Sequence, residues 1–334
     1  FCTFGASCCR CSCSINLLHM RLISFILPVF RNKGSISITC EKLASLMHES
    51  HTDLDFEIIL INDGSDDGSW EEIQEVSQLN PRIKALSFSR NFGQVPAIIA
   101  GTQHCSGDAA VIMSADLQDP VSLITDMIAA WKDNSQIVVC YRMDREDSVM
   151  ANMTSAVFYR FMKIANPKMP KGGFDFVMLD RAAIDVFASI DERNRFFQGD
   201  ILWMGFNIRF LPYKRIKRTI GKSQWSFGKK LKYFIDGSLN TSYMPIRFMS
   251  IAGIGTAFIG FLYAFIVLYA RMINQIPFKG YAPIVILILV IGGMIMIMLG
   301  IIGEYLWRIY DETRKRPLYI VKDKAGNWEE KPKN

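Results

Sequence analysis

Two long apolar runs without any charged residue constrain this 334-residue chain more than any other feature of its sequence. They extend from Phe248 to Ala270 and from Gly280 to Gly303, and only the segment Arg271–Lys279 separates them. Each run is long enough to cross the hydrocarbon core of a bilayer, about 30 Å, as a helix. We therefore predict two transmembrane helices, at about 248–270 and 281–303, that form an antiparallel hairpin within residues 244–306.

Charged residues around the two runs predict their orientation. The connecting segment carries only Arg271 and Lys279. More cations lie on the outer flanks: Arg247 before the first run, and Arg308, Arg314, Lys315 and Arg316 after the second. Because Lys and Arg accumulate in cytoplasmic segments, we expect both flanks in the cytoplasm. Residues 307–334 are then a cytoplasmic basic tail of a multi-pass membrane protein.

A basic stretch precedes the first run. The net charge of the chain is only +6, but no acidic residue lies between Asp200 and Asp236. The cations there are Arg209, Lys214, Arg215, Lys217, Arg218, Lys222, Lys229, Lys230 and Lys232. Such a stretch favours anionic partners, and its position favours a membrane surface over nucleic acid. Residues 226–243 have the spacing of an amphipathic juxtamembrane helix, with a soluble basic helix as the alternative.

The amino-terminal segment differs from the rest in its cysteines. Cys2, Cys8, Cys9, Cys11 and Cys13 crowd the first thirteen residues. Their spacing fits no zinc pattern, and the segment lacks the basic, apolar and small-residue regions of a signal peptide. We interpret residues 1–19 as an N-terminal extension outside the fold.

Residues 20–225 are predicted to form an α/β domain. Five strand-like segments lie at 22–28, 57–62, 83–89, 109–114 and 137–141, and helical periodicity at 36–49, 69–79, 96–105 and 120–132 alternates with them. This alternation indicates a doubly wound, mainly parallel sheet. The later part is less regular, with an extended piece at 174–179 and helices near 149–165, 181–190 and 196–204.

Ligands of doubly wound sheets bind outside the carboxyl ends of the strands. This rule selects four polar or glycine-containing loops, at 29–33, 63–68, 90–94 and 115–120. Asp63 and Asp116 each follow an apolar strand directly, where a carboxylate can contact a nucleoside or hold Mg²⁺ or Mn²⁺ beside a diphosphate. Asp119 precedes Pro120, so we assign it to the N-cap of the following helix.

Several segments resemble the signature blocks of the family-two inverting glycosyltransferases, most closely those that act on polyprenyl phosphates. The blocks are Asn62-Asp-Gly-Ser-Asp-Asp-Gly-Ser69, Ser89-Arg-Asn-Phe-Gly93, Ala115-Asp-Leu-Gln-Asp-Pro120, Phe174-Asp-Phe176, Glu192-Arg-Asn-Arg-Phe-Phe197, Tyr213 to Trp225, Gly303-Glu-Tyr-Leu306 and Arg316-Pro-Leu-Tyr319. They span about Met20 to Val321 in order. The resemblance implies a nucleotide-sugar transferase A-type fold at the cytoplasmic face of a bacterial inner membrane.

The resemblance also implies roles for individual residues. Asp116 and Asp175 would be catalytic, and Asp116 with Gln118 would hold the metal, Mg²⁺ or Mn²⁺. The nucleotide sugar would contact Pro28, Phe30, Asp63, Ser114, Asp116 and Gln118. The acceptor phosphate would bind Arg215, Arg218 and Ser223. The implied reaction moves a hexose, from UDP-glucose or a related donor, to undecaprenyl or another polyprenyl phosphate for cell-envelope glycan or O-antigen modification, in a homo-oligomer such as a homotetramer.

Three departures from the family pattern stand beside these matches. Ser114 occupies the first position of the usual Asp-x-Asp, the loop 28–33 lacks an acid, and Gln224 replaces a Lys. Two alternatives stay open: a membrane-anchored scaffold with a degenerate transferase domain, and a transferase for another lipid or polysaccharide acceptor.

Overall fold

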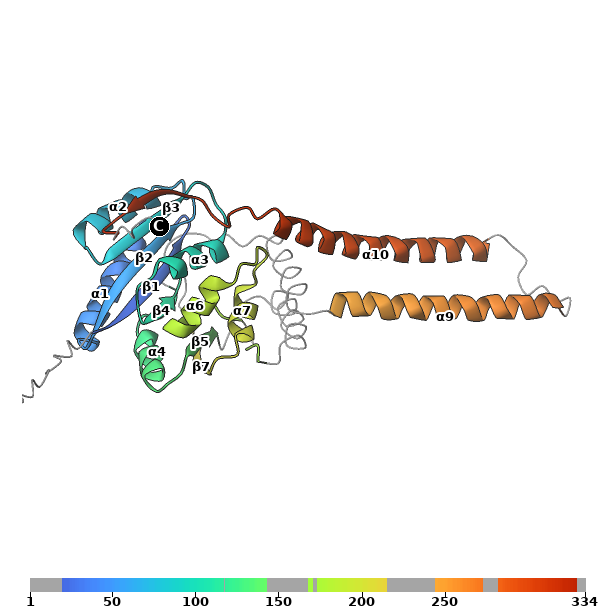
Figure 1. Cartoon of the computed structure of the whole chain (residues 1–334), viewed down its shortest axis with the longest axis horizontal. Helices are drawn as coiled ribbons and strands as arrows, with labels where there is room; N and C mark the ends of the chain where they lie inside the picture. Colours follow the sequence, from blue (N-terminus) through green and yellow to red (C-terminus); the bar gives the residue numbers. More distant parts are fainter. Residues whose placement is uncertain are drawn as a thin grey trace, which may run out of the picture.

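The computed structural model describes residues 20–116, 118–142, 168–170, 173–214, 244–272 and 282–328. They form an α/β domain and two long helices, α9 (Met244–Met272) and α10 (Ala282–Thr313), which extend side by side away from the domain (Figure 1). The predicted extension at 1–19 and the predicted helices at 149–165 and 226–243 lie outside the described residues.

The domain is built on one eight-stranded sheet. Its strands are β1 (Arg21–Val29), β2 (Leu54–Asn62), β3 (Ile83–Phe88), β4 (Ala109–Ile112), β5 (Ile137–Arg142), β6 (Phe176–Asp180), β7 (Ile208–Tyr213) and β8 (Val321–Ala325). They are ordered β7-β5-β6-β4-β1-β2-β3-β8. The five strands expected between residues 22 and 141 are confirmed, whereas the sequence analysis did not predict β7 and β8.

The sheet is mainly parallel, as expected, but two of its eight strands are reversed, which the sequence analysis did not predict. Strands β1 to β4 pair in parallel with one another, and so do β5 and β7. Strand β6 runs antiparallel to β4 and β5, and β8 runs antiparallel to β3. Both reversed strands begin at the edge where their neighbours end, so they return across the sheet in the opposite direction.

Helices cover both faces of the sheet (Figure 1). One face packs against α1 (Ile36–Ser50), α2 (Ser69–Leu79) and α4 (Leu123–Lys132), and the other against α3 (Gln94–His104), α6 (Arg181–Ser189) and α7 (Phe197–Trp203). In β1, Phe25 and Leu27 belong to the first core cluster, and Ile26 to the second. A strand that is buried on both faces needs an unbroken apolar sequence. The doubly wound arrangement is therefore confirmed.

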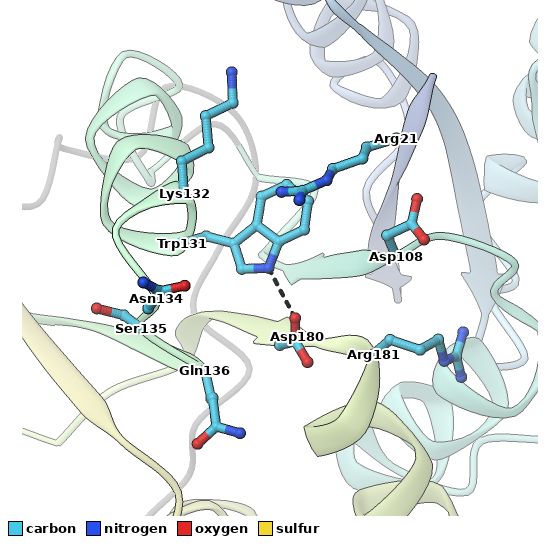
Figure 2. Close-up of a pocket in the computed structure, with 9 residues that line it drawn as sticks. All are labelled: Arg21, Asp108, Trp131, Lys132, Asn134, Ser135, Gln136, Asp180 and Arg181. Carbon is cyan, nitrogen blue, oxygen red and sulfur yellow. Dashed lines mark hydrogen bonds between the residues drawn. The ribbon is translucent and has the colours of Figure 1, made fainter. Parts of the chain in front are cut away.

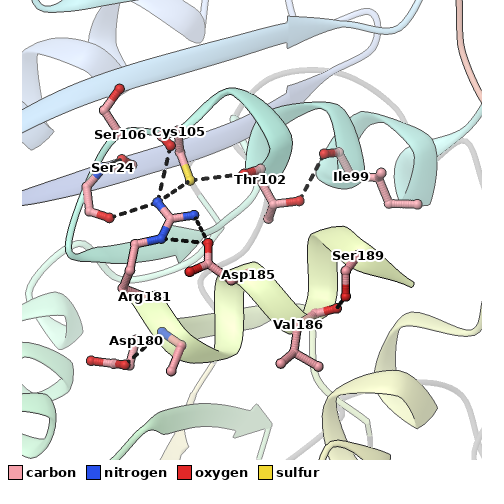
Figure 3. A network of polar contacts seen from close by, with 12 residues as sticks. Ser24, Ile99, Thr102, Cys105, Ser106, Asp180, Arg181, Asp185, Val186 and Ser189 are labelled. Carbon is pink, nitrogen blue, oxygen red and sulfur yellow. Dashed lines mark hydrogen bonds and ion pairs between the residues drawn. The ribbon is translucent and has the colours of Figure 1, made fainter. Parts of the chain in front are cut away.

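Arg181 fixes the packing of α6 against α3 at the amino edge of the sheet (Figure 3). Its Nη1 donates to the carbonyl oxygens of Cys105 and Gly107, both at 3.2 Å. Its Nε and Nη2 donate to Asp185 Oδ1 at 2.9 and 2.6 Å. This guanidinium satisfies carbonyl groups where α3 ends and thereby joins two helices on the same face of the sheet.

The two long helices expose an unusual amount of apolar surface. Phe261 in α9 and Met296 in α10 are 73% and 69% exposed. Among the described residues, Val290–Thr313 is long and apolar enough to cross a membrane, and the apolar stretch in α9, Met249–Tyr263, is shorter. Apolar surfaces of this extent mark a place that lipid or another protein covers.

Candidate active site

The strand order locates a switch point between β1 and β4. The chain passes from β1 outward through β2 and β3, and then returns to place β4 on the other side of β1. In open α/β sheets the ligand crevice lies at the carboxyl ends of the strands at such a point. Pro28 is the second-last residue of β1, and Phe30 directly follows that strand. Ser114 and Asp116 follow β4. The fold thus brings four predicted site residues to this edge.

Hydrogen bonds join the loops that follow β1, β2 and β4. Ser35 Oγ donates to the carbonyl oxygen of Ala115 at 2.8 Å. The backbone N–H groups of Arg31 and Asn32 donate to Ser65 Oγ and Ser69 Oγ, both at 3.1 Å. Loops far apart in the sequence therefore form one connected rim around the carboxyl edge, and they include three of the four loops that the sequence analysis selected.

Asp63 connects the loop after β3 to this rim. Its Oδ1 accepts from the N–H of Phe92 at 2.7 Å, and its Oδ2 from the N–H of Gly93 at 2.9 Å. Burial raises the pKa of Asp63 to about 6, although these two N–H groups and Arg90 act in the opposite direction. Asp63 therefore fixes the Arg90–Gly93 loop, a task that the sequence analysis did not assign to it.

Arg31 lies in the first loop, which lacks the acid that the family pattern has there. Its guanidinium makes two parallel hydrogen bonds with the carboxylate of Asp66, both of 2.7 Å, and lies over the ring of Phe30. The ion pair therefore joins the loop after β1 to the loop after β2 through a bidentate contact.

Asp116 is buried after β4, with 2% of its surface exposed, and its Oδ1 accepts from the N–H of Gln118 at 3.3 Å. No group of three or more His, Cys, Asp or Glu side chains with metal-ligating geometry occurs within the described part of the chain. Asp116 and Gln118 offer oxygen donors only, which is the donor type that Mg²⁺ and Mn²⁺ take.

The predicted N-cap role of Asp119 is wrong. Helix α4 begins at Leu123, after Ser122. Asp119 is buried, and it accepts a 2.8 Å hydrogen bond from the hydroxyl of Tyr213 and a 3.3 Å hydrogen bond from the N–H of Ser114. Tyr213 ends β7, a strand absent from the sequence-based prediction, so a tertiary partner displaced the local cap.

Asp175 forms an ion pair with a residue that the sequence analysis did not select. Arg142 Nη2 donates to Asp175 Oδ2 at 2.8 Å, and the Arg142 side chain is 11% exposed against 41% for Asp175. Arg142 ends β5, and the parallel register places it beside Tyr213. Burial lowers the pKa of Arg142, but Asp175 and Tyr213 outweigh it, so that the pKa is raised overall.

These contacts form a polar chain, which we call the Arg142 cluster: Asp175, Arg142, Tyr213 and Asp119. Burial, followed by the charge of Asp119, raises the pKa of Tyr213 above its usual range. The Nε of Arg142 is buried and has no hydrogen-bond partner among the described residues. Buried polar atoms are normally satisfied, so an unpaired buried N–H in this cluster is unusual.

A buried amide holds the backbone next to Asp175. Gln198 Nε2 donates to the carbonyl oxygen of Phe174 at 2.7 Å, and both Phe174 and Phe176 are buried. The described segment that contains Tyr213 ends at Lys214. The predicted acceptor-phosphate residues Arg215, Arg218 and Ser223 lie outside the described residues.

Two pockets lie at opposite edges of the sheet. The larger, of about 580 Å³, is at the amino edge and is lined by Arg21, Asp108, Trp131, Lys132, Asn134, Ser135, Gln136, Asp180 and Arg181 (Figure 2). It contains none of the predicted site residues, and Asp108 and Asp180 accept hydrogen bonds from Leu22 N–H and Trp131 Nε1. The smaller, of about 310 Å³, lies at the carboxyl edge between the 62–68 loop, Arg90 and β8.

Comparison with known proteins decides the family. The family model described as glycosyl transferase family 2 matches residues 24–190. The chain is 37% identical over 305 residues to the uncharacterized glycosyltransferase YkcC of Bacillus subtilis, which covers 91% of this chain and 94% of the relative. The chain belongs to glycosyl transferase family 2. The resemblance seen in the sequence is therefore confirmed.

Other relatives carry more specific names. The prophage bactoprenol glucosyl transferase homolog of Escherichia coli is 33% identical over 302 residues, which cover 90% of this chain and 98% of the relative. Among solved structures, glucosyl-3-phosphoglycerate synthase from Mycobacterium tuberculosis, in complex with Mn²⁺ and uridine-diphosphate-glucose, matches at 15% identity with a TM-score of 0.43. That match covers 64% of this chain and 76% of the synthase.

Proposed function

We propose that this family 2 glycosyltransferase transfers a hexose from a UDP-sugar, UDP-glucose or a related donor, to undecaprenyl or another polyprenyl phosphate at the cytoplasmic membrane face, with inversion. The observation that carries the proposal is that Asp116 after β4, Asp175 before β6 and Arg142 at the end of β5 all lie at the carboxyl edge of the sheet. Relatives named bactoprenol glucosyl transferase, at 33% identity over 90% of the chain, support the acceptor class.

The proposed reaction is a single displacement. An oxygen of the acceptor phosphate attacks the anomeric carbon, and a new C–O bond forms as the bond to the nucleoside diphosphate breaks. The diphosphate leaves with the bonding electron pair, so the anomeric configuration inverts. A phosphate monoester is already a competent nucleophile, so the protein contributes orientation and charge stabilisation more than proton removal.

The Arg142 cluster fits the acceptor side of this reaction. Arg142 is held by Asp175 through one nitrogen, while its buried Nε is free to donate to a phosphate oxygen. A guanidinium that is already oriented loses little entropy when it binds phosphate. Asp175 then acts by holding Arg142 and the incoming phosphate in line with the anomeric carbon.

Asp116 and Gln118 fit the donor side. Their oxygen atoms suit Mg²⁺ or Mn²⁺, and a site with one carboxylate is completed by diphosphate oxygens and water. When bound, such an ion neutralises the negative charge that develops on the leaving diphosphate. Asp63 keeps the Arg90–Gly93 loop in place beside the donor through its two backbone hydrogen bonds.

The two long helices fit a membrane hairpin. We propose that α9 and α10 both cross the inner membrane of a bacterium, with the segment that joins them outside. An exposed apolar helix pair attached to a polar domain places that domain at the bilayer surface, where a polyprenyl phosphate presents its headgroup. The product would serve cell-envelope glycan or O-antigen modification.

The test is transfer by membranes that contain the full chain, with Mg²⁺ or Mn²⁺ and radiolabelled UDP-hexoses. We expect label in a lipid extract that comigrates with polyprenyl phosphate sugar, and Asp116→Ala should lower the rate at least about 100-fold, the scale for a charge-stabilising group. A chelator should abolish transfer and either ion should restore it. Full activity of Asp116→Ala would remove its proposed role. No labelled lipid with any UDP-hexose would favour the scaffold alternative.

A further inference from the structure

The end of α10 is bound to the catalytic domain through Arg193. Arg193 Nε donates to Asp311 Oδ2 at 3.0 Å, and its backbone N–H donates to Glu312 Oε2 at 3.2 Å. Its Nη1 donates to the carbonyl oxygen of Arg316. The Arg193 and Asp311 side chains are 18% and 23% exposed, so this ion pair is partly shielded from water. Arg193 thus binds both the last turn of α10 and the chain that follows it.

The chain after α10 continues across the domain as a strap, which we define as residues 311–328. Tyr319 stacks on Phe88 with ring centroids 4.9 Å apart, and its hydroxyl donates to Gln103 at 2.7 Å. Strand β8 then pairs with β3, and Trp328 contacts His104 edge-on. These contacts connect residues more than two hundred positions apart, and they fix the strap along its whole length.

The strap reaches both sides of the candidate active site. On the acceptor side, Arg193 lies five residues before Gln198, whose amide bonds the carbonyl oxygen of Phe174 next to Asp175. On the donor side, the N–H of Ser89 donates to the carbonyl oxygen of Ile320 at 3.0 Å. Ser89 opens the loop whose far end Asp63 holds.

We propose that the strap sets the position of the active-site edge relative to α10, and that Arg193 is the positioning residue of this contact. The inference rests on the proposed function, because it concerns an acceptor held in the bilayer. A water-soluble acceptor diffuses to the site in any orientation, whereas the headgroup of an embedded acceptor stays at a fixed depth. Loosening the Arg193 contact therefore impairs reaction with the embedded acceptor and spares the soluble one.

The experiment compares two acceptors on the full chain in proteoliposomes: undecaprenyl phosphate in the bilayer and a short, water-soluble prenyl phosphate. For Arg193→Ala we expect kcat/KM with the embedded acceptor to fall about tenfold, the scale of a modest misplacement. The value with the soluble acceptor should stay within about twofold. Arg193→Lys should recover only part of the loss, because it keeps a cation beside Asp311 but cannot also donate to the carbonyl oxygen of Arg316.

Arg82→Ala is the matched control. Arg82 forms an exposed 3.0 Å ion pair with Asp55, which lies in β2 and not in α10 or the strap. The Arg82→Ala variant should have the same kcat/KM as the wild type with both acceptors. Equal losses with both acceptors for Arg193→Ala would show a merely structural role and overturn the inference, as would no loss at all. If Arg193→Ala does not fold, Asp311→Asn tests the same contact from the helix side.

A second measurement does not depend on activity. Hydrogen–deuterium exchange of the full chain should show faster exchange in Arg193→Ala at 86–93 and 316–325, and no change at 54–62 in the central strand β2. Unchanged exchange in the strap would reject the inference. If the wild type labels no polyprenyl phosphate, the proposed function fails, and exchange alone then decides whether Arg193 holds the strap.

Discussion

Single side chains at the carboxyl edge owe their state to partners from distant loops. Asp63 is 3% exposed, yet it stays in place because two backbone N–H groups of the next loop bind its carboxylate. Arg142 is held in the same way by Asp175, and Asp119 by Tyr213. Buried polar groups in a fold are normally hydrogen-bonded, so each of these side chains depends on its partner to stay buried at the carboxyl edge.

Asp63 should give the stability of the protein a distinct pH dependence. Its folded-state pKa of about 6 lies above its ordinary value of 3.8, so its contribution to folding is complete below about pH 4 and is lost as the pH rises through 6. Asp63→Asn removes this titration. We expect the wild type to lose stability relative to the variant between pH 4 and pH 6, measured by chemical unfolding. A constant difference across that range would contradict the assigned pKa.

Arg142 should matter more for turnover than for folding. Arg142→Ala removes the cation that pairs with Asp175 and, in the proposed reaction, binds the acceptor phosphate. We expect kcat to fall by about 100-fold, the scale of one charge-stabilising donor. Tyr213→Phe keeps the ring and removes only the hydroxyl that Asp119 accepts from, at a cost of about 1–3 kcal/mol in stability. Steady-state kinetics and thermal unfolding separate the two effects. Arg142→Ala with normal kcat would exclude it from the site.

At the scale of elements, the loops after β2 and β3 are packed backbone against backbone. Gly64 has a φ of +66°, and a Cβ at this position would collide with the backbone of Arg90. Only glycine combines that backbone conformation with so close an approach. The packing of these two loops explains why the turn after β2 needs a glycine at this position.

Gly64→Ala should therefore displace the Arg90–Gly93 loop. We expect a loss of stability of about 1–3 kcal/mol, from left-handed backbone strain and the collision together. Donor affinity, measured by calorimetry with a UDP-sugar, should fall as well. Gly34→Ala is a useful comparison, because Gly34 also has a positive φ but an added Cβ there meets nothing within 4 Å. Equal effects of both substitutions would show that strain alone, and not loop packing, is responsible.

At the scale of the whole molecule, a polar domain and an apolar helix pair are joined at two places in the sequence, before α9 and after α10. The second junction is the strap, which ends in a strand of the domain's own sheet. The residues expected as a separate tail thus contribute β8, while α10 extends to Thr313, beyond the predicted end of the second apolar run at 303. The helix pair and the carboxyl edge of the sheet are therefore parts of one connected structure.

The proposed hairpin predicts both membrane behaviour and topology. The protein should remain in the membrane pellet after alkaline carbonate and high salt, since its attachment is apolar rather than electrostatic. A single cysteine introduced as Asn274→Cys, between the two runs, should react with a membrane-impermeant thiol reagent from outside the cell. Leu79→Cys, on an 85% exposed position of α2, should react only after permeabilisation. Release by salt would refute the hairpin, and the reverse labelling pattern would refute its orientation.

The sequence by itself determined the features that depend on local pattern. Strand and helix periodicity located the elements between residues 21 and 132, because buried strands and amphipathic helices need particular repeats of apolar residues. The ends of those strands then located Asp63 and Asp116, and a series of ordered blocks identified the family. Long uncharged runs predicted α9 and α10 as helices.

Only the tertiary structure decided the partners of these residues. Strands β7 and β8 are short and partly exposed, so their apolar pattern is weak, and their pairing depends on elements far away in the sequence. Because β7 was not predicted, the sequence could not place the hydroxyl of Tyr213 beside Asp119. The N-cap of the following helix was therefore the role predicted for Asp119. Arg142 and Arg193 also gained their roles from contacts across the fold, because an ion pair between distant residues leaves no spacing for a sequence pattern to show.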